Sequence, residues 1–227
     1  MANHLDLEEQ EQLDQLKHFW KQYGNPITWL LIVVLGSVAG WNFYQYWQRS
    51  QASQAAIMFD ELGRAATAGD SAKLDRVFGD IKERFGSTVY AQQAGLTAAK
   101  QYYSAKSIDS AVGALTWVAD QSTDAGYQAI AKLRLADILA EKKSTDEALK
   151  VLSGSFPVGF EALVADRKAD ILLIQGKNKE ATAEYEKAFN SFGDRTEYRR
   201  LVEIKLNALG VSTQLVSSTV AASEGKK

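Results

Sequence analysis

A long uncharged stretch near the N-terminus constrains this chain more than any other feature. Residues 22–48 contain no Asp, Glu, Lys or Arg, and residues 29–41 read WLLIVVLGSVAGW. At about 1.5 Å of rise per residue, a helix over this stretch is ~40 Å long, which exceeds the hydrocarbon core of a bilayer. We therefore predict one transmembrane helix over residues 26–47.

Aromatic side chains stand at both ends of this stretch, where amphipathic rings prefer the boundary between lipid and water. Trp29 lies near its start, and its end holds Trp41, Phe43, Tyr44, Tyr46 and Trp47. The core helix of a soluble protein would leave this aromatic cluster and the missing charges unexplained. A cleaved signal peptide would have a short basic leader, whereas five acids and only two lysines precede Ile27. The stretch is interpreted as an uncleaved anchor.

The residues around the span indicate its orientation. Lys17 and Lys21 precede it, and only Arg49 follows it closely, so the positive-inside rule places the N-terminus in the cytoplasm. Residues 1–25 are predicted to form a short cytoplasmic helix that ends at residues 24–26, Gly-Asn-Pro. Its apolar face, with Leu13 and Trp20, could lie in the membrane interface or meet a partner, and a solvated acidic leader is the alternative.

Two glycines inside the span could form a packing site. Gly36 and Gly40 are four residues apart, and a GxxxG pair lets a second membrane helix approach closely. Small residues are also common in membrane helices that have no such partner. Both interpretations stay open at the level of sequence.

Charge and composition exclude several classes of function. Removing Lys17, Lys21, Arg49 and the five acids before the span from the totals of 26 basic and 28 acidic residues leaves 23 of each. A protein that binds nucleic acid needs an excess of cations to neutralise phosphates, so nucleic acid is not an expected partner. Cysteine is absent, which excludes disulfides and thiolate metal sites.

The residues that usually carry chemistry argue against catalysis. The two histidines, His4 and His18, precede the span, so a histidine-dependent triad or a histidine-rich metal site in the rest of the chain is excluded. The pair Gly36 and Gly40 lies in the span without the Lys of a phosphate-binding loop. We predict a protein that is not an enzyme and that uses no cofactor or metal.

After the span the chain repeats itself. The repeated pattern begins with a small residue, and a larger residue follows three positions later. An Ala stands nine positions after that, and a large residue stands four positions after the Ala. The pattern recurs at intervals of 37 and 33 residues. The three copies are Ala99, Tyr102, Ala111 and Leu115; Ala136, Leu139, Ala148 and Leu152; and Ala169, Leu172, Ala181 and Tyr185. An earlier copy in the same frame has lost its small positions and consists of Leu62, Ala65, Leu74 and Phe78. Terminal repeats of a stacked array are often atypical in this way.

This spacing predicts pairs of antiparallel helices. The first two positions share one face of a helix, and alanines at the crossing let a second helix approach closely. Polar breakers separate the helices, and Asp109 and residues 144–147 offer N-caps. The expected fold is all-α, with one N-terminal transmembrane helix followed by an α-solenoid over residues 48–210. Residues 194–209 are expected to form a capping helix at the end of this domain, and residues 211–227 are expected to form a loose tail after it.

The repeats resemble the tetratricopeptide repeat, which places a small residue, an aromatic, then Ala and a large residue in this order. The signature is degenerate, because no Trp opens the repeats and no Pro closes them. The whole chain is similar to the YfgM family, most strongly at residues 159–167, Gly-Phe-Glu-Ala-Leu-Val-Ala-Asp-Arg, and in the Leu-rich helix that ends at Gly176.

The resemblance implies a single-pass protein of the bacterial inner membrane with its repeat domain in the periplasm. Members of this family are ancillary subunits of the SecYEG translocon, and they associate with a membrane-anchored periplasmic chaperone of the PpiD kind. The expected role is to assist exported polypeptides as they emerge. The family implies no catalytic residues.

The phase of the repeats predicts which side chains line a groove. If the first helix of each hairpin lines a concave surface, residues at fixed offsets from Ala99, Ala136 and Ala169 face into it. These candidates for contact with a partner are Gln93, Lys100, Tyr103, Asp137, Glu141, Asp166 and Asp170. The alternative is that several of them, in particular the acids, face solvent or pair with neighbours.

Two functions from different classes fit these features. The first is a membrane-anchored scaffold that binds proteins through the repeats. The second is a regulator that holds a cytoplasmic signalling protein at the membrane through the face formed by Leu13, Leu16 and Trp20. A membrane-tethered assembly factor for another complex is a further alternative, because a fold alone does not fix a function.

Overall fold

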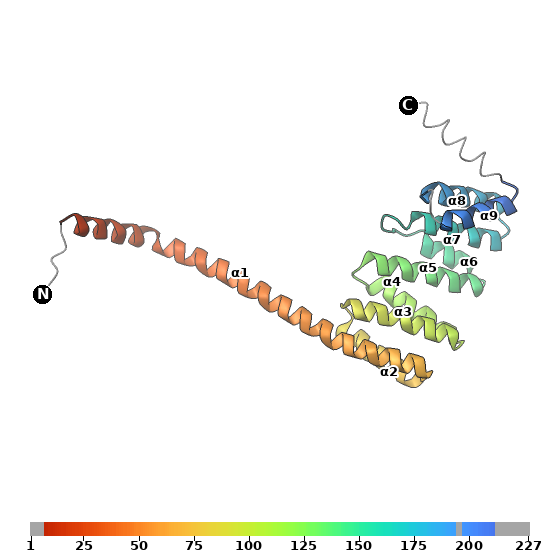
Figure 1. Ribbon diagram of the computed structural model, residues 1–227, viewed down its shortest axis with the longest axis horizontal. Coiled ribbons are helices and arrows are strands. Elements are labelled where there is room, and N and C mark those ends of the chain that lie inside the picture. The colour runs from red at the N-terminus through yellow and green to blue at the C-terminus, as the bar shows by residue number, and fades with distance from the viewer. Residues whose placement is uncertain (1–6, 194–196, 212–227) are drawn as a thin grey trace, which may run out of the picture. The chain divides into compact units, whose positions relative to one another are not determined.

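The computed structural model describes residues 7–193 and 197–211, and in these residues every regular element is an α-helix (Figure 1). The helices are α1 (Leu7–Ala68), α2 (Ser71–Phe85), α3 (Val89–Ser104), α4 (Ile108–Gln121), α5 (Ala125–Glu141), α6 (Thr145–Leu152), α7 (Glu161–Ile174), α8 (Asn178–Ser191) and α9 (Glu197–Ala208). The all-α prediction is confirmed. The predicted tail lies outside the described residues, apart from Val211.

The chain divides into two compact units, Met1–Ser53 and Gln54–Lys227. The described part of the first unit is α1 up to Ser53. Within the described residues α1 is long and apolar enough to cross a membrane, and protein buries none of its apolar window. Its polar side chains bond to the helix itself, because Ser37 Oγ donates to Val33 O (2.7 Å) and Asn42 Nδ2 donates to Val38 O (3.0 Å). A helix with this surface suits a membrane-anchored protein.

The predicted break at residues 24–26 is wrong, since α1 continues through Pro26. Proline has no N–H, so the carbonyl of Gln22 loses one helical hydrogen bond, but the turns on both sides remain helical. Gly24 is buried under the indole of Trp20, where an added Cβ would lie 3.3 Å from Trp20 Nε1. This glycine lets the ring fold over the backbone and does not end the helix.

The second unit is a stack of helical hairpins. The last turns of α1 pair with α2, α3 pairs with α4, α5 with α6, and α7 with α8, and each hairpin contacts the next (Figure 1). The alanines at the predicted crossings, 99, 111, 136, 148, 169 and 181, are all at most 3% exposed. The large residues of the frame are buried as well, except that Leu172 is only partly buried. The repeat frame is therefore confirmed.

The first helix of each hairpin ends in the same way, and so does α9. A residue with φ between 64° and 80° follows each of these helices, namely Gly69, Lys106, Lys143, Gly176 and Gly210. The next N–H reaches back to a carbonyl five residues earlier, as Asp70 N does to Ala65 O (3.1 Å). This is the Schellman motif. Its recurrence fixes the register between repeats and shows that α9 occupies the position of a first helix.

Helix α9 closes the stack as the sequence predicts, although residues 194–196 lie outside the described part. Val202 and Leu206 are fully buried against α7 and α8, in a cluster with Ala169 and Tyr185. Ser144 occupies the N-cap position of α6, within the predicted range 144–147, although its side chain makes no cap bond. The N-cap predicted at Asp109 is wrong, because Ser107 occupies that position of α4. Asp109 instead pairs with Lys142 (2.8 Å).

Helices α3 and α4 approach closely at Gly95. A Cβ at this position would lie 2.4 Å from Val118 Cγ2 and 3.4 Å from Trp117 Cε3. The Trp117 ring packs edge-on against Phe78 of the preceding hairpin, with 5.8 Å between ring centroids. Gly95 therefore allows α3 and α4 to pack closely, and Trp117 beside it contacts the preceding hairpin.

We expect Gly95→Ala to lower the free energy of unfolding by about 1 kcal/mol. The gain in helix propensity is about 1 kcal/mol, but overpacking against the buried Val118 costs roughly 1–3 kcal/mol. The matched control is Gly113→Ala on α4, where nothing lies within 4 Å of an added Cβ. This variant should gain up to about 1 kcal/mol. Urea unfolding of the full chain followed by circular dichroism measures both, and a gain in both variants contradicts the close approach.

Candidate functional site

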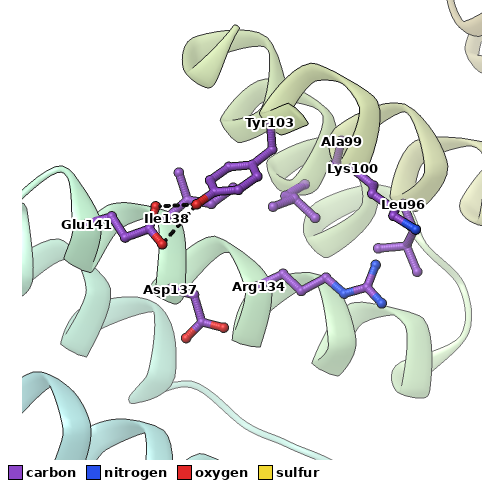
Figure 2. Close-up of a pocket in the computed structure, with 9 residues that line it drawn as sticks. Leu96, Ala99, Lys100, Tyr103, Arg134, Asp137, Ile138 and Glu141 are labelled. Atoms are coloured by element: carbon purple, nitrogen blue, oxygen red, sulfur yellow. Dashed lines mark hydrogen bonds between the residues drawn. The ribbon is translucent and has the colours of Figure 1, made fainter. Parts of the chain in front are cut away.

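A pocket of about 430 Å³ lies between the first helices α3 and α5 (Figure 2). Its apolar lining comes from Leu96 and Ala99 of α3, Leu115 of α4 and Ile138 of α5. Its polar lining consists of Lys100, Tyr103, Arg134, Asp137 and Glu141. An apolar surface with a few convergent polar groups is the usual form of a binding site.

The charges in this pocket are separated. Figure 2 shows the carboxylate of Glu141 beside the Tyr103 hydroxyl at one end, and the guanidinium of Arg134 turned towards Lys100 at the other. The Tyr103 hydroxyl donates to the Glu141 carboxylate, at 2.7 Å from Oε2 and 3.0 Å from Oε1. This bond ties α3 to α5 across the pocket and fixes the acidic end.

The structure places the seven predicted groove residues in three settings. Lys100, Tyr103, Asp137 and Glu141 line the pocket together. Gln93 lies outside this lining, and its Nε2 donates to the Tyr127 hydroxyl (2.8 Å), which links α3 to the start of α5. Whether these side chains contact a partner stays a prediction.

The two remaining candidates, Asp166 and Asp170, pair with neighbouring side chains, which is the alternative given for the acids. Asp166 is completely buried, and Lys205 of α9 donates to its Oδ1 (2.8 Å). Asp170 is partly buried and accepts hydrogen bonds from Lys205 (2.7 Å) and from the Tyr185 hydroxyl (2.6 Å). Because α9 covers this part of α7, these two carboxylates hold the capping helix and do not face an open groove. The repeat phase alone could not indicate that α9 folds back here.

Leu96, Arg134 and Ile138 also line the pocket, although the repeat phase did not predict them. Arg134 had a signal, because it stands 33 residues before Arg167 and therefore occupies the same place in its repeat. Arg167 contacts Asp137 across the next interface, with 3.1 Å between Nε and Oδ1, and Asp170 on its own helix at 3.3 Å. Comparing repeat positions would have placed Arg134 beside Lys100.

Two pKa shifts follow from this arrangement. Burial raises the pKa of the Asp137 carboxyl above its usual value, Arg167 opposes the rise, and the carboxylates of Asp170, Glu141 and Asp166 add to it. Burial works against the charge on Lys205, but its hydrogen bonds to Asp166 and Asp170 raise the pKa of this ammonium above its usual value. The charged form of Lys205 is therefore the form that holds α9.

The stacked hairpins, the shared register and the groove between first helices define an α-solenoid scaffold of the tetratricopeptide-repeat-like class. A family model described as a tetratricopeptide repeat-like domain matches residues 17–211. No solved structure matches the chain.

Curated relatives narrow this class to one family. The chain is 31% identical to the "Ancillary SecYEG translocon subunit" of Neisseria gonorrhoeae, over 92% of this chain and 100% of the relative. Proteins of the same name from Haemophilus influenzae and Escherichia coli are 29% and 26% identical, over 89% of this chain and 98% and 97% of their own lengths. The chain belongs to this family, the YfgM family.

We expect Lys205→Met to destabilise the second unit by about 3 kcal/mol, because it leaves the buried carboxylate of Asp166 without its cation. Among the described residues, the Tyr198 hydroxyl still donates to Asp166 Oδ2, over 3.3 Å. Lys187→Met is the control, since its pair with Glu184 is 3.9 Å long and Lys187 is exposed. It should change stability by less than about 0.5 kcal/mol. Urea unfolding of both variants tests the role of α9, and equal losses contradict it.

We expect Arg167→Gln to raise the pKa of Asp137 further, because Arg167 is the group that opposes the rise. A carboxyl whose pKa is higher in the folded than in the unfolded protein stabilises the fold when it is protonated. Its contribution is present below the unfolded pKa and is lost as the pH rises through the folded pKa. Titration of the carboxyl ¹³C resonance measures the shift, with Asp137→Asn to assign the signal. An unchanged or lower pKa contradicts the ion pair.

Proposed function

We propose that this chain is an ancillary subunit of the SecYEG translocon that binds other proteins through its repeats. The observation that carries the proposal is the full-length similarity to relatives of that name, which includes the apolar part of α1 as well as the repeats. A scaffold needs no catalytic residues, and the groove between α3 and α5 has the size and lining of a protein-binding subsite.

The proposed topology has one span. Residues 1–25 lie in the cytoplasm, residues 26–47 cross the bacterial inner membrane, and residues 48–210 form the periplasmic repeat domain, followed by residues 211–227. The excess of Lys before the span supports this orientation. Exported polypeptides would then emerge from the translocon on the side of the membrane where the repeats stand.

The proposed partners are the translocon, a PpiD-like periplasmic chaperone and exported polypeptides. The exposed surface of α1 supports contact with other membrane helices. An added Cβ at Gly36 or Gly40 meets nothing within 4 Å, so this surface is open to a neighbouring helix. The mixed charges of the pocket support contact with polypeptides on the other side.

Affinity purification of the full chain in mild detergent, read by mass spectrometry, tests the proposal. The translocon subunits and a PpiD-like chaperone should be enriched over a control membrane protein. Gly36→Leu with Gly40→Leu should reduce the enrichment of membrane partners if those glycines form a helix contact. The translocon function is contradicted if its subunits are absent from the purified material.

Protease accessibility tests the orientation independently. Protease added to spheroplasts, whose periplasmic face is exposed, should digest the repeats and leave residues 1–25 intact. In inverted membrane vesicles the pattern should reverse. Digestion of the N-terminal segment in spheroplasts would place the repeats in the cytoplasm instead.

A second candidate function is regulation of a cytoplasmic signalling protein. The observation that favours it is the exposed apolar face before the span, where Leu16 is 63% and Trp20 59% exposed. Deleting residues 5–16 separates the two functions. Loss of cytoplasmic signalling with intact translocon association favours regulation, and the opposite result favours the scaffold.

A further inference from the structure

At each interface between successive first helices, side chains from equivalent repeat positions come together. The charges of these side chains differ from one interface to the next. Between α5 and α7, Arg167 meets the carboxylate of Asp137, which belongs to the preceding repeat. One repeat earlier, Arg134 replaces Arg167 and Lys100 replaces Asp137. The repeat geometry that brings a cation to a carboxylate in one interface therefore brings two cations together in the other.

Lys100 and Arg134 lie at the same rim of the pocket. Among the residues that the structure describes, neither Lys100 nor Arg134 forms an ion pair, and both side chains are exposed at the pocket. Asp137 is three residues from Arg134, but it pairs with Arg167, and Figure 2 shows the Arg134 guanidinium turned away from it. Two like charges at one rim repel each other, and a carboxylate between them would remove that repulsion.

The rest of the pocket limits what that carboxylate can belong to. The apolar surface of Leu96, Ala99 and Ile138 lies beside the cations and suits an aliphatic side chain. Asp137 and Glu141 stand at the opposite end of the same pocket. These acids disfavour a multiply charged group such as a phosphate, and they favour a ligand with one negative charge and hydrogen-bond donors near it.

We propose that Lys100 and Arg134 bind the side-chain carboxylate of an Asp or Glu in a partner polypeptide, with a neighbouring aliphatic side chain seated on Leu96 and Ile138. The proposal rests on the scaffold function and names the chemistry of its groove. A side-chain carboxylate is the group that Arg167 meets at the equivalent place, so the repeat geometry already accommodates it there. The subsite selects acidic-aliphatic segments among the polypeptides that reach the repeats.

Capped synthetic peptides test this selection on the full chain in lipid nanodiscs. The probes are nonapeptides of Gly and Ser with a central Leu-Glu, Leu-Gln or Leu-Lys pair, acetylated and amidated at their ends and read by fluorescence anisotropy. The Leu-Glu peptide should bind about tenfold more tightly than the Leu-Gln peptide, the size expected for one charge-assisted contact. The preference should weaken as the ionic strength rises.

Variants of the two cations assign the preference to this pocket. Lys100→Gln with Arg134→Gln should bind the Leu-Glu and Leu-Gln peptides equally, and Lys100→Glu with Arg134→Glu should prefer the Leu-Lys peptide. Lys150→Glu on the second helix α6 is the matched control and should keep the preference for Leu-Glu. Circular dichroism establishes that each variant is folded.

Several outcomes overturn the proposal. They are equal binding of all peptides by the unaltered chain, no binding of the Leu-Glu peptide, and a preference that survives the Gln variants. Tighter binding of a Leu-Gln peptide with a free C-terminus would assign the cations to a terminal carboxylate instead. Competition by inorganic phosphate as strong as that by the Leu-Glu peptide would indicate a general anion site.

Copurification of the translocon with the unaltered chain separates this proposal from the scaffold function. If the peptides show no preference while the translocon still copurifies with the unaltered chain, only the subsite is wrong. If the translocon does not copurify with the unaltered chain, the scaffold function fails, whatever the peptides show.

Discussion

The close approach of paired helices at buried alanines is the contact on which the rest of the repeat domain depends. In the hairpins α3–α4, α5–α6 and α7–α8 the alanines at the crossing are at most 3% exposed, and larger side chains such as Tyr185 and Leu115 close the space beside them. Because this contact repeats at intervals of 33 to 37 residues, successive first helices meet at equivalent positions. The pocket between α3 and α5 lies at one of these interfaces. Its charges depend on which residues occupy the equivalent repeat positions there.

The segment that most strongly marks the family has structural roles in this chain. Gly159 adopts a φ of 94° and Gly176 a φ of 74°, which L side chains rarely adopt. Asp166 is the buried partner of Lys205, and it holds the capping helix against α7. The residues of this segment therefore form the turns on both sides of α7 and hold the capping helix. The pocket lies one repeat earlier, in a part of the chain where the motifs are looser.

Sequence reasoning predicts the parts of this structure that depend on short-range patterns. The apolar run, the breakers between helices and the spacing of Ala99, Ala136 and Ala169 were sufficient to predict a helical anchor followed by hairpins. The break at Pro26 was predicted from local preference, yet one missing hydrogen bond did not end a helix of this length. The burial of Asp166 depends on α9 folding back onto α7, a contact between residues 39 positions apart that no local pattern encodes.

The proposed function requires that polypeptides contact the chain on the face formed by the first helices. Site-specific photocrosslinking from a benzoylphenylalanine on this face tests it most directly, in cells that export protein. We expect adducts with exported polypeptides or a chaperone when the probe replaces Leu96 in the pocket, and none when it replaces the exposed Thr116 on the second helix α4. Equal adducts from both positions, or adducts only from Thr116, would contradict it.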